Sequence, residues 1–193
     1  MTYAHTLTRN IRFRSNHVGG VGKYSAYSNV AFRCLACSLM LSRLDYCNAV
    51  LHRAPASSIQ KLQCVQNTAA HVVLHSARRS PSQPLLQQLH WLPVRQWMDY
   101  KLAVLTYKIH HTSTPVYLSR HPQPLTVTRR LCSSAMPLVC KPTTRTNFAH
   151  RTFCCSAPAV WNSLTADIVD SSSLPIFKRK LKTFLFEHAF SSS

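Results

Sequence analysis

The sequence predicts a mostly α-helical protein: a small helical bundle with a proline-rich irregular insert and a disordered N-terminal arm. Through most of the chain, apolar residues recur at alternating spacings of three and four, which is the period of a helix with one buried side. Five of the 11 prolines fall between positions 113 and 147, and all three glycines fall before position 30. We therefore expect a disordered basic arm over 1–30 and one helical domain over 31–190.

The first two helices are expected to form an αα-hairpin. Residues 31–53 carry one apolar stripe, and Pro55 ends this helix because the residue before a proline is disfavoured in helical conformation. Ser57 or Ser58 is expected to cap the second helix. Its apolar stripe is Ile59, Leu62, Val65, Ala69 and Val72, and the opposite, polar side is Gln60, Gln63, Gln66 and Asn67.

A turn at Ser80–Pro84 and a short helix ending near Trp91–Pro93 lead into a helix over 94–111. Pro93 suits the first turn of that helix, where a missing N–H costs little. The helix carries two apolar stripes, Trp97, Tyr100, Val104, Tyr107 and Met98, Leu102, Leu105, Ile109. A helix that is apolar on two sides should be central in the packing.

The insert over 113–147 cannot hold a long helix, although Ala135–Lys141 fits a short strand or one arm of a β-hairpin. Phe148 to about Leu164 is expected to be helical around Pro158. The last helix, Leu174 to Phe190, places Phe177, Leu181, Phe184 and His188 on one face and Lys178, Arg179 and Lys182 on the opposite face.

Charge sets this chain apart from an average globular protein. It has 23 Lys and Arg against five Asp and Glu, for a net charge of +18. Such a surface favours polyanions, with nucleic acid ahead of an anionic membrane surface. No apolar run approaches the length of a membrane span, and no secretory leader is evident, so we expect an intracellular protein, nuclear or cytoplasmic, with reduced thiols.

The eight cysteines are interpreted as small apolar side chains rather than metal ligands. Cys34 and Cys37 form only half of a zinc site, and the spacings within Cys132, Cys140, His150 and Cys154 are too wide for a compact zinc knuckle. A glycine-rich stretch, Gly19–Lys23, lacks the Ser or Thr that a phosphate-binding loop places after its lysine. We therefore expect no cofactor.

Carboxylates are too few and too scattered for polymerase chemistry. Two-metal catalysis needs carboxylates that hold two ions about 4 Å apart. The acidic residues here are Asp45, Asp99, Asp167, Asp170 and Glu187, and none is adjacent to another. Asp167 and Asp170 are expected to face solvent. We also expect Trp91, Trp97 and Trp161 to pack in the core rather than stack on bases.

Six phrases in a fixed order give the chain a resemblance to a known family: SRLDYCN (42–48), QNTAAHVV (66–73), LHWLPV (89–94), YKLAVLTYK (100–108), APAVWNSL (157–164) and FKRKLKTFLF (177–186). Together they resemble the C-terminal end of the reverse transcriptase of non-LTR, LINE-type retrotransposons, over roughly residues 38–190. The aromatic-Ala-Asp-Asp signature of these enzymes is absent. His71 stands where the family usually has Arg.

The resemblance implies a thumb-like region near residues 42–48, followed by a C-terminal helical segment that helps to hold template RNA. It also implies a truncated fragment that is not an enzyme. The basic residues that match this role are Arg43, Lys61, Lys101, Lys108, Lys178, Arg179, Lys180 and Lys182. They are expected to contact phosphates of RNA or DNA without reading sequence.

Two other interpretations remain open at the level of sequence. The chain is either the product of a decayed element without a selected function, or a domesticated protein-interaction module that uses apolar helix faces. A stable, folded protein at native expression levels counts against the first. An exposed apolar patch beside the basic face supports the second.

Overall fold

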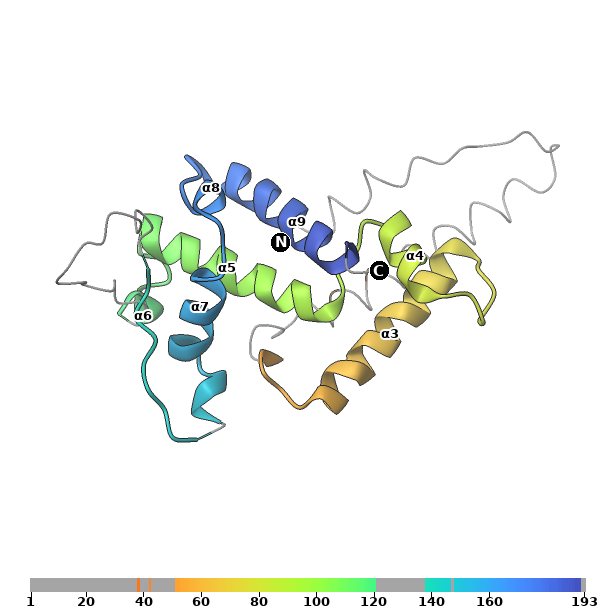
Figure 1. The fold of residues 1–193 in the computed structure, drawn as a ribbon, viewed down its shortest axis with the longest axis horizontal. Helices are drawn as coiled ribbons and strands as arrows, with labels where there is room; N and C mark the ends of the chain where they lie inside the picture. Colours follow the sequence, from red (N-terminus) through yellow and green to blue (C-terminus); the bar gives the residue numbers. More distant parts are fainter. Residues whose placement is uncertain (1–37, 39–41, 43–50, 121–137, 147, 192–193) are drawn as a thin grey trace.

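The computed structural model describes residues 38, 42, 51–120, 138–146 and 148–191 (Figure 1). The expected N-terminal arm, nearly all of the first helix of the expected αα-hairpin, Arg43 and a large part of the proline-rich insert lie outside these residues. The described part is mostly helical, as predicted. Its elements are α3 (Ala56–Leu74), α4 (Ser82–Gln88), α5 (Val94–Thr112), α6 (Val116–Ser119), η2 (Ala149–Arg151), α7 (Phe153–Trp161), α8 (Ala166–Val169) and α9 (Leu174–Phe190).

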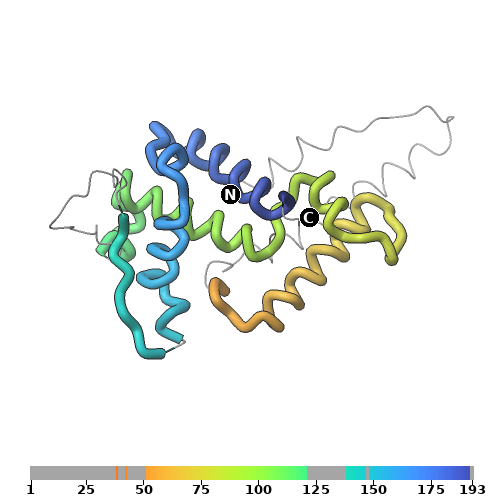
Figure 2. Tube along the Cα trace, in the orientation of Figure 1, coloured from red at the N-terminus to blue at the C-terminus, as the bar shows by residue number. Residues whose placement is uncertain are grey.

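Helix α5 lies at the centre, which confirms the expectation drawn from its two apolar stripes. It packs against α9 and α7 and also touches α3 and α6 (Figure 1). Buried side chains occur on both stripes, including Met98 and Leu102 on one and Tyr100 and Tyr107 on the other. Helix α9 runs back across α5, so the end of α9 lies close to α4 (Figure 2).

Prolines mark where helices begin. The residues before α3, α4, α5 and α6 are Pro55, Pro81, Pro93 and Pro115, each with extended ψ. A proline suits this place because its fixed φ and missing N–H cost little where the helix has no partner for that N–H. The prediction for Pro93 is confirmed in substance, since α5 starts at the next residue.

Two expected helix starts were wrong, and in both cases the helix begins directly after a proline instead of after a capping serine or a turn. Helix α3 begins at Ala56 without a side-chain cap, not after Ser57 or Ser58. Helix α4 begins at Ser82, inside the predicted Ser80–Pro84 turn. Pro84 fits there because it is the third helical residue, and the first N–H groups of a helix have no partner inside it.

The main core lies where α5, α7, α8 and α9 meet. Phe177 is fully buried, and its ring stacks on Tyr107 with centroids 4.2 Å apart. Trp161 is 2% exposed and lies 6.1 Å from Phe177. The Tyr107 hydroxyl donates a hydrogen bond of 2.6 Å to the Ser171 carbonyl oxygen. Trp161 thus packs in the core, as predicted.

A smaller core joins α3 and α4 to the end of α9. It consists of Ala69, Ala70, Leu86, Trp91 and Phe190. Trp91, 8% exposed, is buried as predicted. Trp97 is only half-buried and stacks on Tyr100, with ring centroids 5.2 Å apart.

The predicted polar side of α3 was wrong in part, because Gln66 faces inward while Gln60 is exposed as expected. Gln66 is 5% exposed, whereas Val65 and Val72, from the predicted apolar stripe, are 41% and 43% exposed. The Gln66 side-chain amide donates to the Leu92 carbonyl oxygen at 2.8 Å. The Gln63 amide oxygen accepts the Val94 N–H at 2.9 Å. These amides satisfy backbone groups at the start of α5, which apolar side chains could not do.

The last third of the domain matches the prediction with two adjustments. The expected helix from Phe148 to Leu164 is divided into η2 and α7 by Thr152, whose ψ of 153° is extended. Helix α9 has the predicted bounds, and its N-terminal two thirds bury Phe177, Leu181 and Leu185. His188 is exposed rather than on the buried face. His188 lies about 20° around α9 from Phe177, so its exposure follows from its position near the end of the helix and not from its side.

Residues 138–146 run irregularly beside α7, and no strand forms among the described residues. The strand or hairpin arm expected at Ala135–Lys141 is therefore absent from its described part, 138–141. Val139 forms only an isolated bridge there, and the side chain of Asn162 also holds its backbone. The Asn162 amide oxygen accepts the Val139 N–H, and its amide nitrogen donates to the Val139 carbonyl oxygen, both at 3.0 Å.

Candidate nucleic-acid interface

The basic residues singled out from the sequence are spread over three helices. Lys61 lies on α3, Lys101 and Lys108 lie on α5, and Lys178, Arg179, Lys180 and Lys182 lie on α9. The expectation that Lys178, Arg179 and Lys182 occupy one face opposite the core was wrong in part. Arg179 is exposed, but Lys178 and Lys182 are half-buried at the border of the core.

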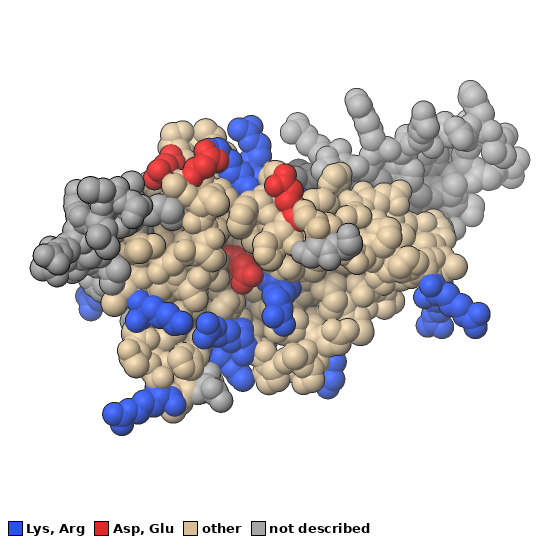
Figure 3. Space-filling model, viewed as in Figure 1, with Lys and Arg blue, Asp and Glu red and all other residues tan. Residues whose placement is uncertain are grey.

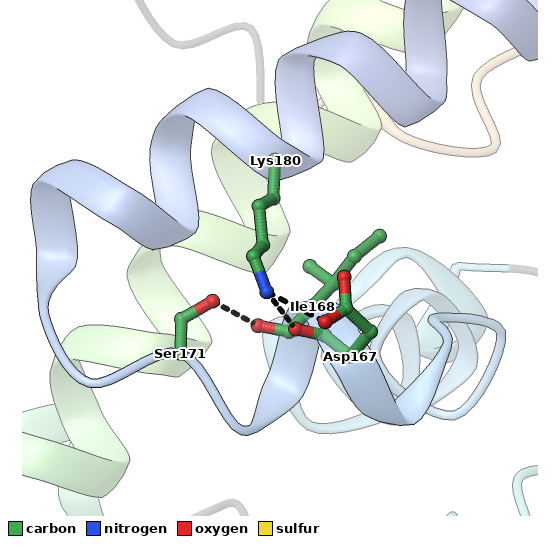
Figure 4. A network of polar contacts seen from close by, with 4 residues as sticks. All are labelled: Asp167, Ile168, Ser171 and Lys180. Atoms are coloured by element: carbon green, nitrogen blue, oxygen red, sulfur yellow. Dashed lines mark hydrogen bonds and ion pairs between the residues drawn. The ribbon is translucent and has the colours of Figure 1, made fainter.

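Lys180 is tied to a carboxylate (Figure 4). Its Nζ donates to Asp167 Oδ1 at 2.7 Å and to the Asp167 carbonyl oxygen at 2.9 Å. Nearby, the Ser171 hydroxyl donates to the Ile168 carbonyl oxygen at 2.7 Å, which closes the turn between α8 and α9. The Asp167 side chain is 78% exposed, as predicted from the sequence. Lys180 therefore positions α8 and is a poorer phosphate ligand than its neighbours.

Helices α5 and α9 are antiparallel neighbours. The Tyr107–Phe177 stack joins the C-terminal half of α5 to the start of α9. At the other end, Phe186 lies 5.6 Å from the ring of His90, which precedes α5. Side chains that leave these two helices in the same direction therefore form a single surface.

Four lysines share that surface. Helix α8 marks one side of α9 through Lys180, and Lys178 and Lys182 each lie about 200° from Lys180 around the helix. Helix α7 packs on the corresponding side of α5, where the ring of its Trp161 lies 5.0 Å from the ring of His110. Lys108 lies about 200° from His110, and Lys101 is two turns before it. The side away from α7 and α8 thus presents the lysine face, defined as Lys101, Lys108, Lys178 and Lys182.

Electrostatics distinguish the lysine face from the rest of the described surface. Burial lowers the pKa of Lys182, because desolvation disfavours its charged form. No ion pair or hydrogen bond links the side-chain Nζ of Lys108, Lys178 or Lys182 to another described residue. Lys101 Nζ lies 6.0 Å from the ring centre of Trp97. A phosphate placed here would offset the desolvation of Lys182 as well as meeting three other charges.

The carboxylates of the described residues lie elsewhere. Asp167 and Asp170 belong to the α8 region, and Glu187 lies about 140° around α9 from Lys182. Asp99 Oδ1 lies 3.4 Å from His52 Nε2. In Figure 3, acidic side chains gather along one edge and at the centre of the face that it shows. On the side of α5 and α9 that carries the lysine face, no described carboxylate is therefore a neighbour of the four lysines.

A second group of basic residues was missed at the level of sequence. Two of them, Lys141 and Arg145, lie in the segment that leads into η2 and α7. Arg151 is the last residue of η2, and Arg120 is the residue directly after α6. We call these four residues the basic strip. The Nε of Arg151 is buried without a hydrogen-bond partner among the described residues. The available signal was the absence of any acid between Asp99 and Asp167.

The cysteines follow the expected apolar role only in part. Cys155 is buried, but Cys64 and Cys140 are exposed. Cys154 Sγ and Cys155 Sγ are 3.9 Å apart. In the described part of the chain, no group of three or more His, Cys, Asp or Glu side chains is placed to hold a metal ion. Cys140 lies near the C-terminal end of α7, whereas His150 and Cys154 lie near its N-terminal end.

None of the helices in the described ranges has both the length and the apolar character needed to span a bilayer. Comparison with protein-family models, with curated proteins and with solved structures yields no match.

Proposed function

We propose that this chain binds RNA or DNA without sequence preference, and that the lysine face is its main contact with phosphates. The observation that supports this most directly is the grouping of Lys101, Lys108, Lys178 and Lys182 on one side of the α5–α9 pair. Lysines on rigid helices suit phosphate contact, because they act as point charges at fixed intervals and require no base readout.

We also propose an origin for the chain, as the C-terminal remnant of a LINE-type reverse transcriptase that has kept a holding role without catalysis. The order of the six sequence phrases supports this origin. Its five scattered acids support the lack of polymerase chemistry, because no two of them are adjacent. Under this proposal the fragment retains nucleic acid but does not copy it.

A salt titration tests the lysine face. The affinity of the 193-residue chain for a labelled oligonucleotide is measured by fluorescence anisotropy between about 50 and 200 mM salt. Each phosphate contact contributes about 0.7 to 0.9 to the slope of log K against log salt. The double variant Lys108→Gln/Lys178→Gln should lower that slope by about 1.4 to 1.8.

The matched control is Arg78→Gln/Arg79→Gln, which removes the same charge from two exposed positions in the loop that follows α3. The control should change the slope of log K against log salt by much less than the roughly 0.7 that one phosphate contact contributes. An equal loss in both variants would mean that net charge, and not the lysine face, governs binding. Absence of retention at the lowest salt would eliminate the proposal altogether.

A further inference from the structure

Two aromatic rings are exposed to a degree that core packing does not explain. Phe148 is 78% exposed and Tyr117 is 74% exposed, more than any other large apolar side chain among the described residues. Aromatic side chains normally bury most of their area, because that area dominates the gain on folding. An exposed ring beside basic side chains is a candidate contact for a ligand.

The two rings lie near opposite ends of the basic strip. Tyr117 is one turn before Arg120 in α6, and a hollow is lined by Val116, Tyr117 and Arg120. Phe148 lies between Arg145 and Arg151, immediately before η2. Each ring thus has basic neighbours in its own segment, and Figure 3 shows basic side chains gathered over the end that holds α6 and α7.

The strip is held in place at both ends. Val139 is bonded to Asn162 at the C-terminal end of α7. Thr144 Oγ1 lies 2.9 Å from His150 Nδ1, which ties the segment to η2 at the other end. Between these anchors lies α7, whose nine residues span about 14 Å. That length covers about four phosphates at the ~3.4 Å spacing of stacked nucleotides.

Charge selects an anionic ligand for this surface. No carboxylate occurs between Asp99 and Asp167, so α6, residues 138–146, η2 and α7 present no acid to a passing polyanion. A positively charged track with exposed rings is the combination that binds single-stranded nucleic acid, since every unpaired base offers a face for stacking. In a duplex those faces are already stacked on one another.

We propose that Tyr117 and Phe148 stack on unpaired bases of single-stranded RNA or DNA, while Arg120, Lys141, Arg145 and Arg151 contact its phosphates. This inference rests on the proposed nucleic-acid binding and adds to it a preference for single strands over duplex. The surface lies on the α6–α7 side of the molecule and is separate from the lysine face, which points away from α7 and α8.

The test uses the 193-residue chain and the double variant Tyr117→Ala/Phe148→Ala. Both rings are exposed, so circular dichroism should show unchanged folding. Anisotropy is measured with a labelled single strand and with its duplex. Single-strand affinity should fall by about fivefold or more for each ring, while duplex affinity and the salt slope stay unchanged. Tyr117→Trp/Phe148→Trp should retain single-strand binding, because stacking tolerates a different ring.

Val65→Ala/Val72→Ala is the matched control, since it removes exposed apolar side chains from α3. It should leave both affinities unchanged. If the unmodified chain binds but the aromatic variant keeps its ratio of single-strand to duplex affinity, the stacking surface is overturned and the lysine face stands. If the unmodified chain binds neither strand form, both proposals fail. A last experiment competes the single strand with poly-glutamate of equal charge. If poly-glutamate displaces the strand, and if the aromatic variant loses affinity for both ligands equally, the surface binds an acidic protein and the inference is overturned.

Discussion

The two halves of the described domain are held together by different means. Around α5, α7, α8 and α9, large rings and aliphatic side chains form one continuous core that includes Tyr107, Trp161 and Phe177. Around α3 and α4 the core is small, with two alanines at its centre. There the side-chain amides of Gln63 and Gln66 provide the specific contacts, and the end of α9 provides Phe190. Buried apolar area therefore stabilises the half built from α5, α7, α8 and α9. Hydrogen bonds from side-chain amides position the half built from α3 and α4.

This difference predicts how each half fails. Removing a ring from the large core should destabilise the whole domain, since α5 takes part in the two most extensive helix–helix contacts, with α9 and with α7. Removing an amide from α3 should release α3 and α4 while α5 and α9 stay packed. Local opening with a free energy below that of global unfolding is expected wherever few apolar contacts hold an element.

The largest expected effect is that of Phe177→Ala. The side chain is fully buried between Tyr107 and Trp161. Its loss should lower the free energy of unfolding by about 3 to 5 kcal/mol, because a cavity adds to the lost transfer energy. Urea denaturation followed by circular dichroism measures this. Phe184→Ala is the control, since that ring is only partly buried. Equal losses would place the centre of the core elsewhere on α9.

Gln66→Met should come next, with a loss of about 2 kcal/mol. The variant keeps the volume of the side chain but removes the donor to the Leu92 carbonyl oxygen and the acceptor for the Gln63 amide. A buried carbonyl left without a partner costs about 1 to 3 kcal/mol. Hydrogen exchange should accelerate in α3 but not in α9. Gln60→Met, at an exposed position of α3, should change neither rate. Uniform acceleration throughout the domain would contradict the division into two halves.

Tyr107→Phe should have a smaller effect, near 1 kcal/mol, because one hydrogen bond is lost while the ring stays in the core. The hydroxyl donates only to the Ser171 carbonyl oxygen, 2.6 Å away. Thermal unfolding should show a fall in Tm, with exchange rates rising first around Ser171. Tyr117→Phe, in exposed α6, is the control. A Tm that does not change would show that water replaces the lost donor.

The smallest effect concerns pH. Burial, followed by the charge of His111, lowers the pKa of His110. The unfolded chain then binds the proton more tightly than the folded one, so stability rises with pH and is lost as pH falls below the ordinary histidine range. The fall in Tm between pH 7.5 and 5 should be slightly smaller in His110→Gln. His188→Gln, at an exposed position, serves for comparison. A steeper fall in His110→Gln would reverse the sign of this assignment.

Apolar periodicity predicted the bounds and the buried side of a helix well where apolar residues alone form the side that faces the core. The bounds of α9 and the central place of α5 follow from apolar spacing that no other contact opposes. The orientation of α3 could not be predicted in this way. Gln63 and Gln66 face inward because they satisfy the backbone at the start of α5, and their partners are 31 and 26 positions away in the sequence. A helical wheel does not contain that information.

The candidate interface was predicted by residue type but not by position. Lysine spacing within α5 and within α9 is visible in the sequence, whereas their meeting on one surface depends on the antiparallel packing at Tyr107 and Phe177. Lys180 was assigned to phosphate contact from the family resemblance, and its ion pair was not foreseen because its partner, Asp167, is 13 residues away. The basic strip was overlooked because its members are separated by prolines and polar residues rather than arranged with a period.

The side chain of Asn162 performs for Val139 what a neighbouring strand would do, since it both accepts and donates. One residue thereby fixes the start of the 138–146 segment to the C-terminal end of α7, so the loss of this single side chain would release both backbone groups of Val139 at once.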